Sequence, residues 1–172
     1  MLRKILQKIL KNLARQVINK YRPQIIGITG SVGKTTAKEA TIKVLSAKYR
    51  VRGNIKNYNN EIGLPLTILG LESAGKSLVG WLKIFIKSYQ LILSRQNDYP
   101  EFLVLEMGVD HPGDIDYLLS VVGPTSGIVT TIGQAHLEFF GNQEAIATEK
   151  GKLVAYLPAD GFAVLNIDDK RV

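Results

Sequence analysis

The chain has 172 residues, enough for one domain, and its 45 % hydrophobic and 22 % charged residues are typical of a folded protein. It contains no cysteine, which excludes disulfide bonds, cysteine zinc sites and cysteine nucleophiles. The formal net charge of +7 is of a size often found in nucleic-acid-binding proteins. Residues 1–22, however, hold seven basic and no acidic residues, so residues 23–172 are neutral. A neutral body argues against a nucleic-acid partner.

Residues 1–22 carry apolar side chains spaced three and four apart with basic residues between them, which predicts a basic amphipathic helix ending before Pro23. Charge recurs too often for a membrane-spanning helix, and the features of a secretion signal are missing. Two alternatives are open: the helix packs on its own domain, or it lies on an anionic membrane surface. Residues 76–95 have a similar pattern and the same two alternatives.

From Gln24 onward, strand-like and helix-like segments alternate. Near-continuous apolar strands separated by helices predict an α/β fold, with a mostly parallel sheet covered by helices on both faces. The expected strands are 25–29, 101–106, 127–132 and 162–167, and the expected helices are 34–48, 114–122 and 143–157. Residues 55–75 and 96–100, rich in Asn, Gly and Pro, are expected to be loops.

The strongest motif is GITGSVGKTT, residues 27–36, between an apolar strand and a helix. Glycines let such a loop curl so that its amides point at phosphate oxygens, and the helix N-terminus adds positive charge. Lys34 is expected to reach the β- and γ-phosphates, and the Thr35 hydroxyl to bind magnesium. Ile28 stands where the usual motif has its first glycine, with Gly27 one place early. The loop predicts a P-loop NTPase-like fold that binds ATP with Mg²⁺.

Two further residues are candidate metal ligands. Glu106 ends the apolar strand FLVLE, and ligands of parallel α/β sheets gather at the carboxyl ends of strands. His136 follows another expected strand, where it is either a metal ligand or an ordinary loop histidine.

Five segments, in this order, together resemble the central ATP-binding domain of the Mur ligases. They are GITGSVGKTT (27–36), NYNNEIGLPLTIL (57–69), LEMGVDHPGDI (105–115), TTIGQAHLEFFGNQEAIATEKGKL (130–153) and VLNIDD (164–169). Within the family they are most similar to the members that join D-alanyl-D-alanine to a UDP-linked muramoyl tripeptide.

The resemblance implies an ATP-dependent amide ligase of peptidoglycan precursor synthesis. Members of the family use ATP to convert a substrate carboxylate into an acyl phosphate, which an incoming amine then attacks. The physical logic is coherent without the family, because Mg²⁺ and Lys34 would offset the repulsion between the anions that must meet.

The resemblance also implies roles for individual residues. Lys34, His136 and Lys150 would be catalytic. Thr35 and Glu106 would bind a first magnesium ion and His136 a second. Lys150 lies fourteen residues after His136, where the family carries a lysine that carbon dioxide converts into a metal-binding carbamate. The expected ATP-binding residues are Gly30, Ser31, Val32, Gly33, Lys34, Thr35 and Thr36 at the phosphates, Asn59 and Asn60 near them, and Asn166 and Asp169 beside the adenine.

The expected organisation is a basic helix over 1–22 followed by the central ATP-binding domain over 23–172, incomplete at its C-terminal end. Since the family has further domains, the chain is expected to be an ATP-binding fragment that does not complete ligation alone. One alternative is another ligase of the superfamily, of the folylpolyglutamate or cyanophycin synthetase type. Another is a noncatalytic nucleotide-binding module that docks on a membrane. The expected location is cytoplasmic, with peripheral contact to the inner face of the membrane through residues 1–22.

Overall fold

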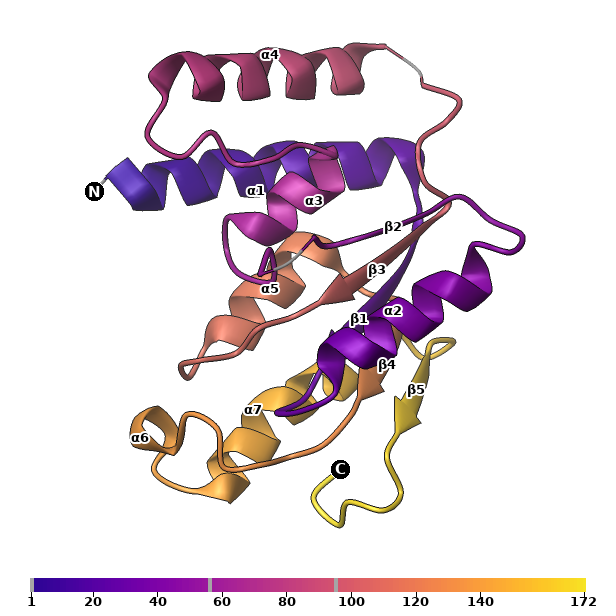
Figure 1. Cartoon of the computed structure of the whole chain (residues 1–172), viewed down its shortest axis with the longest axis vertical. Helices are drawn as coiled ribbons and strands as arrows, with labels where there is room; N and C mark the ends of the chain where they lie inside the picture. Colours follow the sequence, from indigo (N-terminus) through magenta and orange to yellow (C-terminus); the bar gives the residue numbers. More distant parts are fainter. Residues whose placement is uncertain (1, 56, 95) are drawn as a thin grey trace.

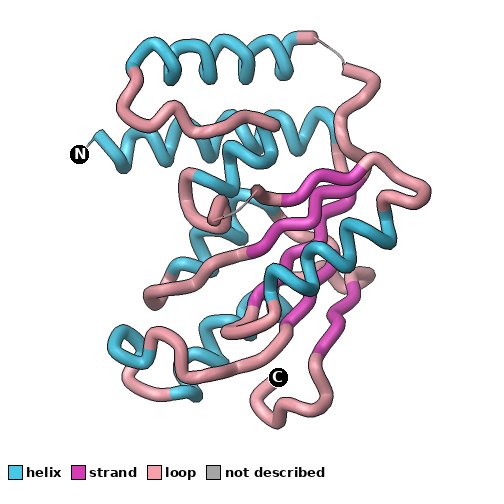
Figure 2. Tube along the Cα trace, viewed as in Figure 1, coloured by secondary structure: helices cyan, strands magenta, loops and turns pink. Residues whose placement is uncertain are grey.

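The computed structural model describes residues 2–55, 57–94 and 96–172, so Met1, Lys56 and Arg95 of the predicted segments lie outside the described residues. A five-stranded parallel sheet forms the centre, in the order β2-β3-β1-β4-β5 (Figure 1, Figure 2). Its strands are β1 (Gln24–Thr29), β2 (Val51–Gly53), β3 (Phe102–Glu106), β4 (Ser126–Val129) and β5 (Phe162–Leu165). The predicted α/β fold is confirmed.

Helices cover both faces of this sheet, α2 in front of it in Figure 1 and α7 behind it. The helices are α1 (Leu2–Tyr21), α2 (Lys34–Leu45), α3 (Gly63–Leu69), α4 (Leu78–Leu93), α5 (Asp114–Val122), α6 (Leu137–Phe140) and α7 (Gln143–Tyr156). Two glycines let helices approach the strands closely. A Cβ at Gly53 would lie 2.4 Å from Ile42 of α2, and one at Gly27 would lie 2.9 Å from Leu153 of α7.

The basic helix α1 is part of the hydrophobic core. Its buried residues are Leu10, Leu13, Ala14 and Val17, on the side that packs against α3, α4 and α5. The predicted amphipathic helix is confirmed, and its apolar side packs on the rest of the chain, as in the first of the two alternatives. No helix in the described part of the chain is long and apolar enough to cross a membrane. The division of the chain at residue 22 stays a prediction.

The helix predicted over 76–95 is α4, which forms an outer layer on α1 on the side away from the sheet (Figure 1). Lys20 of α1 donates to the carbonyl oxygens of Leu91 (3.1 Å) and Ile92 (2.7 Å), and the Tyr21 hydroxyl donates to that of Leu91 (2.9 Å). The carbonyl oxygens at the end of a helix receive no hydrogen bond from within the helix, so Lys20 and Tyr21 supply the missing donors. The positive charge of Lys20 also interacts favourably with the helix dipole. The end of α4 is therefore fastened to α1.

The expected loop over 55–75 is wrong for residues 63–69, which form the fully buried helix α3. Asn60 Oδ1 accepts hydrogen bonds from the amides of Ile62 (3.2 Å) and Gly63 (3.0 Å), which starts the helix. Pro65 lies in the first turn, where a missing N–H costs no helical hydrogen bond. A helix so short and so apolar shows no 3.6-residue period, so its sequence resembles a loop. The three-residue edge strand β2 was not predicted either.

Candidate functional site

The phosphate loop joins the end of β1 to the start of α2 and has the curled backbone that its sequence predicts. Gly30 and Gly33 have φ angles of 143° and 85°, in the region that favours glycine. A Cβ at Gly30 would also lie 1.9 Å from Thr130 Oγ1. The Ser31 amide donates to the carbonyl of Thr131 at 2.7 Å, which holds the loop against the end of β4.

Donor groups collect around this loop. Lys34 Nζ donates to the carbonyl oxygens of Gly30 (2.9 Å) and Ser31 (3.3 Å), so its ammonium lies over the loop. The first amides of α2, which include those of Thr35 and Thr36, have no acceptor within a helix. Ser31 Oγ is buried without a hydrogen-bond partner among the described residues, which costs about 1–3 kcal/mol. These groups fit the acceptor oxygens of a bound phosphate.

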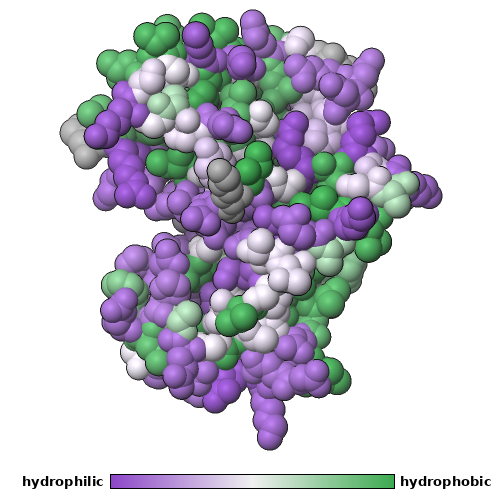
Figure 3. Space-filling view, viewed as in Figure 1, coloured by the Kyte–Doolittle hydropathy of each residue, from purple (hydrophilic) through white to green (hydrophobic). Residues whose placement is uncertain are grey.

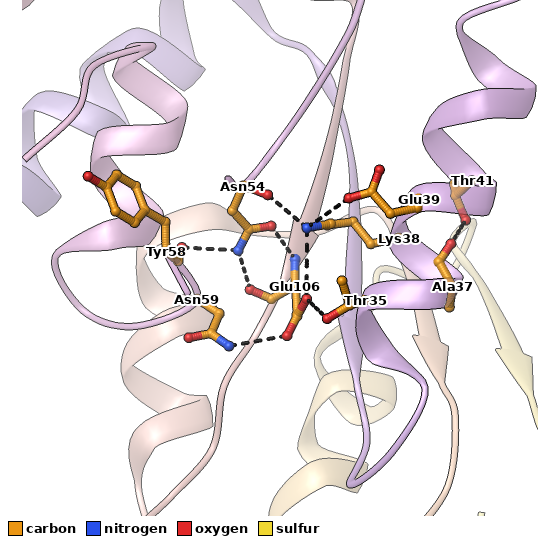
Figure 4. A network of polar contacts seen from close by, with 9 residues as sticks. All are labelled: Thr35, Ala37, Lys38, Glu39, Thr41, Asn54, Tyr58, Asn59 and Glu106. Atoms are coloured by element: carbon orange, nitrogen blue, oxygen red, sulfur yellow. Dashed lines mark hydrogen bonds and ion pairs between the residues drawn. The ribbon is translucent and has the colours of Figure 1, made fainter. Parts of the chain in front are cut away.

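Glu106, at the carboxyl end of β3, is held by several polar contacts (Figure 4). Thr35 Oγ1 donates to its Oε2 at 2.9 Å, and Asn59 Nδ2 donates to its Oε1 at 3.2 Å. Lys38 Nζ lies 4.0 Å from Oε2, and the Asn54 side chain bonds the main chain of Glu106. Glu106 is 5 % exposed, and these contacts orient its carboxylate beside the phosphate loop.

A cavity of about 200 Å³ adjoins Glu106 and the loop. Four predicted catalytic or metal-binding residues line it from separate segments of the chain, namely Lys34, Glu106, His136 and Lys150. Its lining also includes Gly30, Ser31, Asn59, Gly108, Val109, Asp110 and Ala135. The structure thus brings the central part of the predicted site together.

His136 reaches this cavity from the start of α6. Its φ of 65° is rare for a residue other than glycine and costs of order 1–2 kcal/mol. Its Nε2 lies 3.3 Å from Asp110 Oδ1, on the segment that follows β3. Both side chains line the cavity that Glu106 also lines, so this contact forms a second polar pair in the site.

Lys150, on α7, is a buried lysine with an open environment on its cavity side. It is 3 % exposed, and its ammonium makes no hydrogen bond or ion pair within the described part of the chain. Burial, helped by the positive charge of Lys34 and opposed by Asp110 and Glu149, lowers the pKa of Lys150 to about 8. The neighbouring Glu149 accepts from the amides of Gly113 (2.8 Å) and Ile115 (3.3 Å) and so is engaged by α5.

The lining of the cavity does not include seven predicted residues, namely Val32, Gly33, Thr35 and Thr36 of the phosphate loop and, beyond that loop, Asn60, Asn166 and Asp169. Asn166 lines a separate hollow of about 370 Å³ beside Val32 and Gly33, on the β5 side of the loop. Asp169 accepts from the amides of Ile132 (2.7 Å) and Arg171 (3.0 Å), and these hydrogen bonds hold the pKa of its carboxyl below its usual range. Asn60 caps α3.

The donor set can be compared with the needs of Mg²⁺. Across residues 2–55, 57–94 and 96–172, no three His, Asp or Glu side chains form a complete metal site. Mg²⁺ is usually held by one or two carboxylates together with water and substrate phosphates, so Thr35 and Glu106 fit it. Beside His136, the carboxylate of Asp110 offers the oxygen ligand that Mg²⁺ prefers to nitrogen.

Three residues of the site were not predicted. Asp110 follows the strand that ends in Glu106, and this position in EMGVD could have indicated it. Lys38 lies one helical turn after Lys34, on the same face of α2, but a lysine on a helix usually faces water. Asn54 follows β2, a strand that the sequence did not reveal.

Comparison with known proteins places this geometry in a family. The chain matches the Mur ligase middle domain over residues 28–79 and 86–172. It is 33 % identical over 155 residues to the UDP-N-acetylmuramoyl-tripeptide–D-alanyl-D-alanine ligase of Bacillus subtilis, and 38 % identical over 145 residues to that of Synechocystis. These alignments cover 90 % and 84 % of this chain, and 28 % and 26 % of the two relatives.

A solved structure is similar as well. The MurF ligase from Thermotoga maritima in complex with ADP has a TM-score of 0.74 and 32 % identity, covering 95 % of this chain and 32 % of that one. The chain therefore spans about a third or less of the length of these relatives. Because the family match extends over most of its residues, the chain belongs to the Mur ligase middle domain family.

Proposed function

We propose that this chain supplies the ATP-binding part of a cytoplasmic ligase that joins D-alanyl-D-alanine to a UDP-linked muramoyl tripeptide. The observation that carries the proposal is the cavity in which Lys34, Glu106, His136 and Lys150 meet. The proposal is supported by the position of a carboxylate beside a loop suited to phosphate, because phosphoryl transfer needs a metal ion at the phosphates. The names of the two curated relatives and the ADP in the Thermotoga ligase support the same reaction.

The nucleotide would bind with its phosphates on the loop. Residues 30–36 would contribute amides, and Lys34 would turn from the carbonyls that it now contacts to the β- and γ-phosphates. Thr35 and Glu106 would hold Mg²⁺, which supplies positive charge to the oxygens of the transferred phosphoryl group. The adenine would lie in the hollow beside Asn166, whose apolar lining includes Val164 and Leu165.

The two chemical steps need little from the chain except positioning and charge. The substrate carboxylate attacks the γ-phosphorus without a general base, because it is already an anion, and ADP leaves. The amine then attacks the acyl carbon, loses a proton, and releases phosphate as the amide bond forms. A second hollow, of about 430 Å³, shares Asn59, Gly108 and Asp110 with the cavity and is our candidate for the reacting end of the peptide.

Lys150 would act as a carbamate. Its lowered pKa leaves part of the amine neutral near pH 8, and only the neutral amine attacks carbon dioxide. The ammonium first loses one proton to give the neutral amine, and a second proton leaves as the new N–C bond forms, so overall a cation becomes an anion. That anion would lie beside the ammonium of Lys34 and could help hold the second magnesium with His136 and Asp110.

Because the proposal makes this chain the ATP-binding part of a ligase, ligation is tested with the purified full-length gene product. UDP-muramoyl tripeptide, D-alanyl-D-alanine and ATP are supplied, and amide product and phosphate are measured. We expect Lys34→Ala to lower the rate by more than about 100-fold, because phosphate positioning and charge stabilisation are lost together. Lys43→Ala removes an exposed lysine from the same helix and should leave the rate unchanged.

The substrates in this assay separate the alternatives. Product from a folate and glutamate, but not from D-alanyl-D-alanine, would favour the folylpolyglutamate type. Binding of ATP without any amide product would favour a noncatalytic module. Equal ligation by wild type and Lys34→Ala would contradict the proposed phosphate site.

A second candidate function is contact with an anionic membrane surface, favoured by the outer face of α4. Five exposed apolar residues form a stripe along it, namely Val79, Leu82, Ile86, Tyr89 and Leu93. Lys83 and Lys87 flank this stripe, and neither α1 nor α4 contains an acidic residue. Figure 3 shows green apolar and purple polar residues mixed at this upper end of the molecule. Such a helix can lie in a membrane interface, with lysines at the headgroups.

Vesicle flotation tests this contact. We expect flotation with vesicles of mixed zwitterionic and anionic lipid and none with zwitterionic lipid alone. Leu82→Ser with Ile86→Ser should abolish it if α4 makes the contact. Ile5→Ser with Ile9→Ser, at exposed positions of α1, should abolish it if residues 1–22 do. Flotation unaffected by both pairs would contradict a membrane role for either helix.

A further inference from the structure

Asn54 holds the main chain of the residue that carries the central carboxylate. Its Nδ2 donates to the carbonyl oxygen of Glu106 at 2.7 Å, and its Oδ1 accepts from the amide of Glu106 at 2.8 Å (Figure 4). Strand β2 ends one residue earlier, at Gly53. The Asn54 side chain therefore takes the place of a neighbouring strand and satisfies both main-chain groups of Glu106.

The opposite side of Glu106 is held by β1. Ile28 is its partner in the parallel register, and the amide of Met107 donates to the carbonyl of Ile28 at 2.8 Å. The backbone at Glu106 is thus fixed from two sides, although it lies at the end of its strand. Since a fixed backbone limits the directions open to a side chain, the carboxylate stays aimed at the cavity.

Lys38 fastens this arrangement to α2. Its Nζ donates to the carbonyl oxygen of Asn54 at 2.8 Å and lies 4.0 Å from Glu106 Oε2. Asn54 is 3 % exposed and Lys38 2 % exposed, so neither contact is a solvent-facing one. Asn54 also donates to the carbonyl of Tyr58 at 3.0 Å, near the start of the segment that carries Asn59. One buried amide therefore connects β2, β3 and the asparagine-rich loop.

We infer that Asn54 is a positioning residue for the metal-binding carboxylate: it orients Glu106 for Mg²⁺ while touching neither metal nor substrate. The inference rests on the proposed function, because that function supplies the metal. Residues that orient metal ligands in this way commonly change metal affinity by about 10- to 100-fold when they are replaced. A role confined to folding would leave the metal affinity of the folded protein unchanged.

The experiment measures the Mg²⁺ concentration that gives half of the full thermal shift at a fixed excess of ADP. Each variant is compared with its own melting temperature in EDTA, so that lost stability and lost metal affinity are separated. For Asn54→Ala we expect this concentration to rise at least about tenfold. Asn54→Asp keeps the size of the side chain and the acceptor for the Glu106 amide but loses the donor. Asn54→Asp should therefore also raise the Mg²⁺ midpoint, and it tests the inference even if Asn54→Ala fails to fold.

Tyr99→Phe is the matched control. It removes another buried hydrogen bond, from the Tyr99 hydroxyl to the carbonyl of Ile68 at 2.8 Å, beyond the other end of β3. We expect it to lower the melting temperature without changing the Mg²⁺ midpoint. If a folded Asn54 variant has the midpoint of wild type, the positioning role is wrong. If wild type itself shows no shift with Mg²⁺ and ADP, the proposed nucleotide site is wrong, and the inference falls with it.

Discussion

Two buried lysines lie on different sides of the cavity, and their surroundings differ in nature. Lys38, beside β3, donates to Asn54 and pairs with the carboxylates of Glu39 (3.2 Å) and Glu106 (4.0 Å). Lys150, on α7, has no hydrogen bond or ion pair among the described residues and lines the same cavity as Lys34, whose charge acts on it. The ammonium of Lys38 therefore has anionic partners, whereas that of Lys150 has none among the described residues.

The difference separates two uses of the same side chain. A buried ammonium with anionic partners balances charge and holds structure. A buried ammonium without partners is destabilised in its charged form, so its amine is more readily neutral and nucleophilic. The β3 side of the site therefore holds structure, and the α7 side is where we propose covalent modification.

The largest expected effect comes from removing the first lysine. Lys38→Met leaves the Glu106 carboxylate without its buried cation and the carbonyl of Asn54 without its donor. We expect a loss of about 3–5 kcal/mol in the free energy of unfolding, measured by urea denaturation in EDTA. Combining it with Glu106→Gln should recover part of this loss, because the unpaired charge is then gone. A loss no larger than that of Lys43→Met, at an exposed site, would show that Lys38 is not a counter-ion.

Replacing Lys150 should have the opposite effect and raise the free energy of unfolding. Below pH 8 the native protein carries the charged Lys150 at a cost of up to about 3 kcal/mol, which Lys150→Met avoids. Between pH 8 and 10.5 the native state binds fewer protons than the unfolded chain, so wild type gains stability relative to the variant as pH rises. Urea denaturation of both proteins across this range measures the difference. A constant difference at every pH would contradict a lowered pKa.

Carbamate formation sharpens the comparison further. We expect ¹³C-labelled bicarbonate to give a carbamate NMR signal with wild type near pH 8 and none with Lys150→Met. Lys152 provides a matched control on the same helix, because hydrogen bonds to Asp116 and Glu149 raise its pKa and keep it protonated. Lys152→Met should therefore retain the signal. Loss of the signal in both variants, or in neither, would contradict a specific reaction at Lys150.

The sequence predicts the parts of the site whose chemistry is local. The phosphate loop, Glu106 at a strand end and the alternation of strands and helices follow from neighbouring residues. Asn54 and Lys38 have no such signal, because their roles depend on Glu106, which lies 52 residues after Asn54 in the chain. A buried lysine on a helix differs from a solvated one only in tertiary contacts, and these were not visible in the pattern.

Asn59 and Asn60 also show that tertiary contacts are not visible in the sequence. Their replacement gives the smallest effects that we predict. Both were predicted near the phosphates, yet Asn59 contacts Glu106 whereas Asn60 caps α3. For Asn60→Ala we therefore expect a loss of about 1 kcal/mol in the free energy of unfolding and no change in the Mg²⁺ midpoint with ADP. Asn59→Ala should raise that midpoint, since it removes a direct hydrogen bond to the carboxylate. If Asn60→Ala raises the midpoint as much as Asn59→Ala does, the cap and the metal support are one unit rather than two.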